Sequence, residues 1–357
     1  RLSNNQLTGA IPSAIRKMTS LRYLYLSHNM LTDSIPSQMS SLWTLHYLHL
    51  DNNKLGGSIP GALSSLSSLV SLSMANNELE GPIFSFPASF YRLTHLELSN
   101  NKLTGVIPTS IGVLTNLNAL VLSNNTLTGS IPTSIIGLSK LHALYLNDNK
   151  LEGSIPSTIG LLHDLSWMYK TDPSWELSSN AISGPIPTTL RELLSLETLM
   201  LDGNALESPI PTSLSALKAL KHMDVSKNKF SEDFPSFFTR MKKMKHMKLS
   251  NNNFTGSIPA SISSLVSLTY LDLGYTLLAG TIPTAITKMQ HLSRLDLRIP
   301  TLTGSIPASM GAMLDLQYLY VNYEATPCGS GECEVVQYSG TAFCRACTDF
   351  CDSCDRK

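Results

Sequence analysis

The 357-residue chain has little charge and no excess of either sign. It contains 26 lysines and arginines against 26 aspartates and glutamates, and charged residues make up only 15% of it. Proteins that bind nucleic acid or a membrane surface carry a marked basic excess, so this balance argues against both partners. The chain also lacks any run of about 18 apolar residues, the length that a membrane-spanning helix requires. No cysteine precedes Cys328.

Catalytic patterns are missing as well. No Ser-His-Asp order, phosphate-binding loop or kinase motif can be placed, and the nine histidines are scattered along the chain. Catalysis needs several reactive groups that converge in one pocket. The sequence therefore predicts a protein that is not an enzyme, with no cofactor and no metal site.

What the chain has is a repeat. Residues Leu117 to Lys140 read LNALVLSNNTLTGSIPTSIIGLSK, and Leu141 begins the same pattern again. A period of about 20 to 29 residues with the form L-x-x-L-x-L-x-x-N-x-L is typical of a leucine-rich repeat, in which each repeat makes one turn of a solenoid. A single repeat buries too little apolar surface to fold alone, so the repeats must stack. Seven apolar positions recur within each: in this repeat they are Leu117, Leu120, Leu122, Leu127, Ile131, Ile135 and Leu138.

Asparagine occupies one slot of almost every repeat. It recurs every 24 residues, except for one step of 31, at Asn5, Asn29, Asn53, Asn77, Asn101, Asn125, Asn149, Asn180, Asn204, Asn228 and Asn252. The same slot then holds Thr276, Pro300 and Glu324. We expect these amides to lie inside each turn and to bind backbone groups that no strand reaches.

The full pattern L-x-x-L-x-L-x-x-N-x-L-x-G-x-I-P-x-x-I-x-x-L resembles the plant-specific class of leucine-rich repeats. That class is found in ectodomains of plant receptor-like kinases and receptor-like proteins, in polygalacturonase-inhibiting proteins, and in some algal and protist proteins. The resemblance implies an α/β solenoid, a right-handed superhelix with a parallel sheet on its concave side. The same scaffold serves many ligands, so the resemblance says less about function than about fold.

The repeats divide the chain into a solenoid over residues 1–324 and a cysteine-rich cap over residues 325–357. The chain begins partway through a strand, and we expect the natural protein to extend upstream. The 31-residue step contains a seven-residue surplus, which we assign to an insert at 170–176. This alignment places Trp167 and Tyr169 on the strand beside Tyr145, with Trp175 in the insert.

The cap holds all six cysteines: Cys328, Cys333, Cys344, Cys347, Cys351 and Cys354. The last four have a spacing that would place the first and last roughly 15 Å apart on a helix, too far for one zinc ion. An even number in one terminal segment instead predicts disulfides and an extracellular location. The tail lacks the cap spacing usual in land plants, which leaves an algal or protist source open. Two glycosylation sequons, at Asn124 and Asn253, also favour secretion.

Ligand binding is expected on the concave strands, where side chains from successive repeats form columns. One column reads Tyr23, Tyr47, Ser71, His95, Ala119, Ala143, Trp167, Thr198, His222, His246, Tyr270, Arg294 and Tyr318. The next reads Tyr25, His49, Ser73, Glu97, Val121, Tyr145, Tyr169, Met200, Asp224, Lys248, Asp272, Asp296 and Tyr320. Since aromatic residues dominate interface energies, the predicted ligand-binding residues are Tyr23, Tyr25, Tyr47, His49, His95, Glu97, Tyr145, Trp167, Tyr169 and Trp175.

These columns predict recognition of a protein, peptide or glycan, as in a receptor ectodomain or a secreted hydrolase inhibitor. The alternative is a structural component of an extracellular matrix or cell-surface assembly. Two smaller features allow more than one interpretation. His222 and His246, near Asp224 and Asp272, could bind metal or sense pH, but cross-strand polar pairing is favoured. The segment Arg240 to Lys248, RMKKMKHMK, is interpreted as core methionines separated by solvated cations, with a polyanion site as the alternative.

Overall fold

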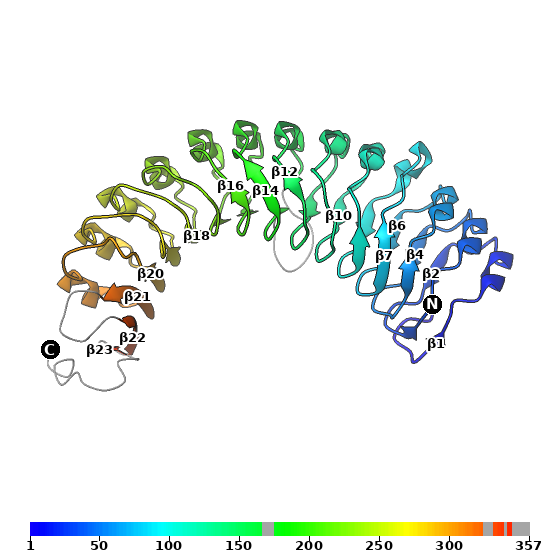
Figure 1. Cartoon of the computed structure of the whole chain (residues 1–357), viewed down its shortest axis with the longest axis horizontal. Helices are drawn as coiled ribbons and strands as arrows, with labels where there is room; N and C mark the ends of the chain where they lie inside the picture. The colour runs from blue at the N-terminus through cyan, green and yellow to red at the C-terminus, as the bar shows by residue number, and fades with distance from the viewer. Residues whose placement is uncertain (166–174, 324–330, 339–340, 345–357) are drawn as a thin grey trace. The chain divides into compact units, whose positions relative to one another are not determined.

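The computed structural model describes residues 1–165, 175–323, 331–338 and 341–344 (Figure 1). Of Trp175 and of the residues after Val321, it describes only the backbone. The chain forms two compact units, Arg1–Leu196 (unit 1) and Glu197–Lys357 (unit 2), which are treated separately below. In each unit, short parallel strands form a sheet on one side and 3-10 helices form a row on the other (Figure 1).

Unit 1 builds its main sheet from one strand per repeat, all parallel. In order these are β2 (Tyr23–Tyr25), β4 (Tyr47–His49), β6 (Ser71–Ser73), β8 (His95–Glu97), β10 (Ala119–Val121), β11 (Ala143–Tyr145) and β13 (Trp175–Glu176). Further strands pair outside this sheet: β1 (Thr8–Gly9), β3 (Met30–Leu31), β5 (Gly56–Ser58), β7 (Glu78–Pro82), β9 (Lys102–Thr104), β12 (Glu152–Gly153) and β14 (Ala181–Gly184). The 3-10 helices are η1 (Ser13–Lys17), η2 (Ser37–Ser41), η3 (Gly61–Ser65), η4 (Ala88–Arg92), η5 (Thr109–Val113), η6 (Thr133–Gly137), η7 (Ser157–Leu161) and η8 (Thr188–Glu192).

Unit 2 repeats the arrangement. Its main sheet contains β15 (Thr198–Met200), β17 (His222–Asp224), β18 (His246–Lys248), β19 (Tyr270–Asp272), β20 (Arg294–Leu297), β21 (Tyr318–Tyr323), β22 (Gly331–Tyr338) and β23 (Thr341–Cys344), and β16 (Ala205–Leu206) lies outside it. The 3-10 helices are η9 (Thr212–Ala216), η10 (Ser236–Arg240), η11 (Ala260–Ser264), η12 (Thr284–Lys288) and η13 (Ala308–Ala312).

Each 3-10 helix begins directly after a proline, such as Pro108 before η5 and Pro132 before η6. The ring fixes φ near −65°, and proline has no N–H to leave unpaired, so the chain turns here at little cost. The recurrent leucines and isoleucines of the repeat face inward between the helices and the strands. Leu117, Leu120 and Leu122 are fully buried, which confirms the predicted solenoid register.

The predicted asparagine ladder forms, and amides such as that of Asn125 join two successive repeats. Asn125 accepts the N–H of Leu103 at 3.0 Å and donates to the carbonyl of Leu98 in the preceding repeat at 3.1 Å. Asn29 and Asn149 repeat this pattern. The residue before each ladder asparagine has positive φ: it is 53° at Asn124, a conformation that asparagine tolerates better than most residues. The sequence pattern Asn-Asn therefore combines a turn residue with a ladder residue.

The strand after the seven-residue surplus has a different register from the predicted one. In β13, Trp175 lies opposite Leu144 and Glu176 lies opposite Tyr145. Glu176 therefore occupies the position beside Tyr145 that the predicted alignment assigned to Tyr169, so that alignment is wrong, and Trp175 belongs to a paired strand, not to the insert. Asn180 fixes this register by donating to the carbonyl of Leu146 at 3.0 Å, so the surplus falls before β13. Trp167 and Tyr169 lie outside the described residues.

The end of unit 2 departs from the repeat. Strand β21 pairs parallel with β20 but antiparallel with β22, and β22 pairs antiparallel with β23. This hairpin covers the edge of the last parallel strand, which would otherwise leave backbone groups unpaired. Cys333 and Cys344 lie on β22 and β23, and the other four cysteines lie outside the described residues. The disulfides and the boundary at residue 324 stay predictions.

Candidate functional site

The strands place the two predicted columns side by side on the outward surface of the main sheet, which we call the sheet face. In unit 1, Tyr23 pairs with Tyr47 and Tyr25 with His49. In unit 2, the first column runs from His222 to Tyr318 through five neighbouring strands. Because strands are about 4.8 Å apart, side chains in one column contact one another directly.

Four of the predicted ligand-binding residues form one group, the N-terminal aromatic cluster of Tyr23, Tyr25, Tyr47 and His49. The rings of Tyr23 and Tyr47 stack with centroids 5.3 Å apart, and Tyr25 meets His49 edge to face at 4.8 Å. Tyr23 is 50% exposed, so the cluster offers ring surface to solvent. The sequence correctly predicted that these four residues are neighbours on adjacent strands, and their binding of a ligand stays a prediction.

His95 and Glu97 lie on β8, and β6 with its small Ser71 and Ser73 separates them from the cluster. The His49 Nε2 lies 2.9 Å from the hydroxyl of Ser71. Burial lowers the pKa of His49 below its ordinary value, against the opposing effect of the Asp51 charge. Burial also lowers the pKa of His95, and the nearby His49 adds to that effect.

Glu97 has a structural contact that the sequence did not reveal. Its carboxylate accepts the backbone N–H of Ser99 at 3.2 Å as well as the Ser99 hydroxyl. Burial raises its pKa, and these hydrogen bonds oppose the rise. Tyr145 lies two strands further along the sheet, on β11, and does not join the cluster.

Unit 2 carries a longer continuous surface, the aromatic row of His222, His246, Tyr270, Arg294 and Tyr318. The two histidine rings are 4.7 Å apart, and His246 meets Tyr270 at 6.2 Å. The Arg294 guanidinium lies over Tyr270 at 4.9 Å and over Tyr318 at 5.8 Å. His246 is exposed, Tyr318 is 40% exposed and the other three are partly exposed, so a flat polar and aromatic strip faces solvent.

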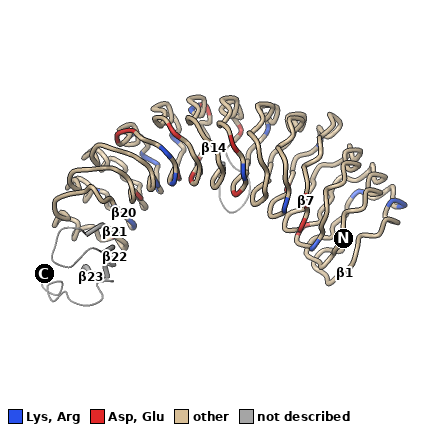
Figure 2. The backbone as a smooth tube through the Cα atoms, in the orientation of Figure 1, with Lys and Arg blue, Asp and Glu red and all other residues tan. Residues whose placement is uncertain are grey.

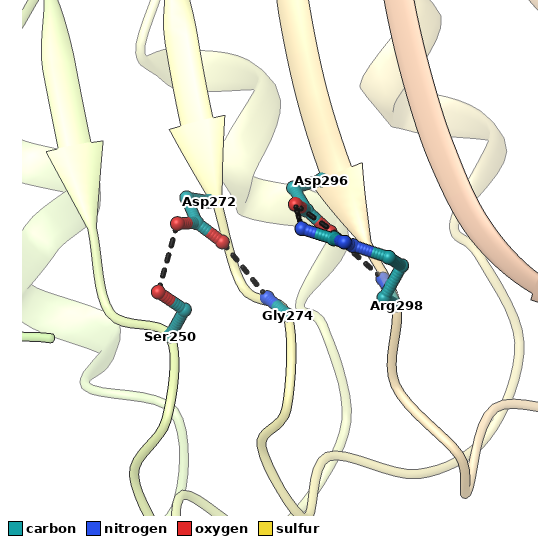
Figure 3. A network of polar contacts seen from close by, with 5 residues as sticks. All are labelled: Ser250, Asp272, Gly274, Asp296 and Arg298. Carbon is teal, nitrogen blue, oxygen red and sulfur yellow. Dashed lines mark hydrogen bonds and ion pairs between the residues drawn. The ribbon is translucent and has the colours of Figure 1, made fainter. Parts of the chain in front are cut away.

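Arg294 is the cationic member of the row. It also contacts the ring of Tyr320 at 5.1 Å. Its Nε is buried without a hydrogen-bond acceptor, and among the residues that the structure describes it has no ion pair. The neighbouring carboxylate of Asp296 is already occupied by Arg298, which binds it through Nε at 3.0 Å and Nη2 at 2.6 Å (Figure 3).

The second column of unit 2 supports the backbone. Asp296 and Asp272 each accept the N–H two residues further on, from Arg298 and Gly274, at 3.1 Å in both cases (Figure 3). Asp272 also accepts the Ser250 hydroxyl at 2.8 Å. Burial is the main cause that raises the pKa of Asp272, and the nearby Asp296 charge adds to it.

Asp224 pairs with Lys248 at 3.1 Å, which is the cross-strand polar pairing that the sequence favoured over a metal site. No group of three potential metal ligands occurs in the described part of the chain. The predicted site residues came from the N-terminal half and the insert, whereas the longest contiguous strip lies in unit 2. The sequence feature that indicates this strip is the recurrence of flat side chains every 24 residues from His222 to Tyr318.

Both sequon asparagines are exposed, so neither is sterically hidden, and their glycosylation stays a prediction. No helix among the described residues is long and apolar enough to span a membrane.

Two models of sequence families match stretches of this chain that include most of its repeats. The model described as leucine-rich repeat region matches residues 84–274, and the model described as leucine rich repeat matches residues 1–55. No curated protein matches the chain.

Solved structures with similar folds include several plant receptors. The PEPR1–AtPEP1 complex is 33% identical over 89% of this chain, with a TM-score of 0.83. The plant peptide hormone receptor RGFR1 in complex with RGF2 is 28% identical over 90%, with a TM-score of 0.74. The Arabidopsis receptor kinase HAESA, in complex with the peptide hormone IDA and the co-receptor SERK1, is 31% identical over 89%, with a TM-score of 0.73.

This chain covers 45%, 58% and 57% of those three chains, respectively, and so spans about half their length. The repeat register, the asparagine ladder, the family models and these structures agree: the chain belongs to the leucine-rich repeat family, in its plant-type form.

Proposed function

We propose that this chain is an extracellular recognition module that binds an extended peptide, free or as a segment of a protein, on the sheet face of unit 2. The aromatic row carries the proposal, because it joins five adjacent strands into one strip of flat side chains with a single cation. The relatives support it: RGFR1 is a plant peptide hormone receptor solved with RGF2, and HAESA is solved with the peptide hormone IDA. The two sequons support the extracellular location, and so does a similar structure that is the ectodomain of a plant membrane receptor kinase.

The dimensions of the row suit a peptide. Five strands at about 4.8 Å span roughly 19 Å, and an extended chain that rises about 3.3 Å per residue covers this length with about six residues. Tyrosine and histidine rings bury much surface while losing little side-chain entropy, which is why such residues dominate interfaces. Arg294 adds a charge-assisted hydrogen bond to an acidic group of the ligand.

The experiment selects linear peptides from a displayed random library on the whole chain and measures the affinity of the selected peptides for variants. Tyr270→Ala and Arg294→Gln should each weaken binding by roughly 10-fold or more, the loss typical of an interface hot spot. The matched control is Tyr91→Ala, since Tyr91 is 48% exposed on η4, away from the sheet face. Circular dichroism confirms that each variant is folded.

Equal affinity of all three variants for the selected peptides would overturn the proposal. The N-terminal aromatic cluster is the second candidate surface, because its stacked tyrosines are solvent-exposed. Tyr47→Ala tests it directly: if this variant alone loses binding, the peptide site lies in unit 1. Selective binding of glycans on an array, with no peptide selected, would instead favour a glycan receptor.

A further inference from the structure

A second surface of unit 2 carries an unusual density of positive charge. In the segment Arg240 to Lys248, the residues Met241, Met244 and Met247 are buried in leucine slots. The cations between them are turned outward: Arg240, Lys242, Lys243 and Lys245 are all exposed. They lie at the end of η10 and in the turn that leads to β18, not in the aromatic row.

The preceding repeat extends this charge. Lys218 is exposed in the slot equivalent to Lys242, directly after the core residue that ends η9. The two turns are in register, because the backbone N–H of Lys245 donates to the carbonyl of Lys221 at 2.7 Å. We call Lys218, Arg240, Lys242, Lys243 and Lys245 the basic patch; the lysines and arginines of unit 2 are coloured in Figure 2.

In the described part of the chain, no acidic side chain forms an ion pair with the basic patch. Lys221, beside it, is neutralised by Glu197 at 2.7 Å. Lys242 donates to the backbone carbonyl of Ser264 at 3.0 Å, a neutral acceptor. Within the described residues, none of the five patch cations has an ion pair. A chain with zero formal net charge thus gathers, on two adjacent turns, five cations that have no ion pair among the described residues.

We propose that the basic patch binds an acidic polysaccharide. Exposed lysines act as mobile point charges, which suit a polymer with regularly spaced carboxylate or sulfate groups more than a single bidentate ligand. Single-stranded nucleic acid requires aromatic side chains on which bases stack. The residues between these cations are instead Met241 and Met244, which face the core. Lys218 and Lys242 occupy equivalent slots of two stacked repeats, so the charges of the two turns lie beside one another.

The experiment measures binding of the whole chain to heparin, as a sulfated probe, and to polygalacturonate, as a carboxylated one. The test variant carries Arg240→Gln, Lys242→Gln, Lys243→Gln and Lys245→Gln. The control removes the same number of charges from dispersed, exposed sites of unit 1 by Arg16→Gln, Lys17→Gln, Lys54→Gln and Lys150→Gln. Both variants should fold, because all eight side chains are exposed, and thermal melting checks this.

The wild type should bind at least one polysaccharide, and its affinity should fall about 10- to 100-fold between 50 and 200 mM salt if about four cations make contacts. The patch variant should bind much more weakly, and its remaining affinity should depend little on salt. The control should keep the affinity and the salt dependence of the wild type. Equal losses in the two variants, or no binding by the wild type, would overturn the proposal. Tighter binding to single-stranded DNA or to anionic vesicles would overturn it in favour of those partners. Tyr270→Ala should leave polysaccharide binding unchanged, which separates this test from that of the peptide site.

Discussion

Replacing Asn125 by alanine should destabilise the solenoid, and the hydrogen bonds of its side chain show which contact accounts for the loss of unfolding free energy. Three carbonyls receive the Asn125 amide, but each has another donor: for example, the carbonyl of Leu98 also accepts from Asn101, and that of Leu122 from Asn149. The N–H of Leu103 has only the Asn125 oxygen, at 3.0 Å, and Leu103 is fully buried. The cost should therefore be that of one orphaned buried donor, about 1–3 kcal/mol.

The matched control is Asn5→Ala. Asn5 occupies the same slot but is exposed, and among the described residues its side chain bonds only to Leu2 and Ser3 of its own repeat. Its replacement should therefore cost less than about 0.5 kcal/mol. Urea denaturation followed by circular dichroism gives the difference in unfolding free energy, and hydrogen exchange should show faster exchange of the Leu103 amide. If the two variants cost the same, or if the Leu103 amide stays protected, the ladder is not what satisfies this backbone.

Three further predictions concern separate features. Burial raises the pKa of Glu97, so the stability that this shift contributes is fully present below the unfolded pKa and is lost as pH rises through the folded pKa. The Glu97→Gln variant cannot ionise at this position, so its stability relative to the wild type should rise as pH increases above about 4.5. Parallel curves of unfolding free energy against pH for the two proteins would refute this. All six cysteines should be oxidised, so thiol titration of the denatured, unreduced chain should find none free, and two or more free thiols would contradict the predicted cap. Deletion of residues 167–173, which restores the 24-residue period and spares β13, should fold with an unchanged or higher melting temperature. It should leave the affinity for the selected peptides unchanged, because the proposed peptide site lies in unit 2; weaker binding would show that this segment takes part in recognition.

Much of the fold could be predicted because one physical requirement repeats along the chain. Every turn must bury the same apolar positions and satisfy the same backbone groups, so a single repeat such as Leu117 to Lys140 specifies its neighbours. The prediction went wrong where the period breaks. The predicted alignment at the surplus extends forward from Leu165. The register of β13 is instead set by the hydrogen bonds of Asn180, which follows this strand in the chain. Counting back from Asn180 would have given the observed pairing of Glu176 with Tyr145.

The hairpin of β22 and β23 could not be predicted, because it lies beyond the last regular repeat and its partners are set by the exposed edge of β21. Within the sites, the columns followed from the spacing, but the contacts within them did not. Whether an arginine binds a carboxylate in addition to a ring depends on which carboxylates are already occupied. Arg298 binds both oxygens of Asp296 and also lies over the rings of Tyr275 and Tyr320. Arg294, four residues earlier in the chain, lies over tyrosine rings and has no ion pair among the described residues.

We expect the two columns of the sheet face of unit 2 to differ in role, one acting in stability and the other in recognition. In unit 2 the second column is used internally: Asp224, Asp272 and Asp296 each hold the backbone N–H two residues further on, and two of them also bind a cation. Buried carboxylates with their hydrogen bonds filled have little capacity left for a ligand. In the first column, the rings and Arg294 contact one another by their faces and edges, and the His222 ring also lies 3.2 Å from the Thr198 hydroxyl. Substitutions in the second column should therefore act mainly on stability, and substitutions in the aromatic row mainly on affinity.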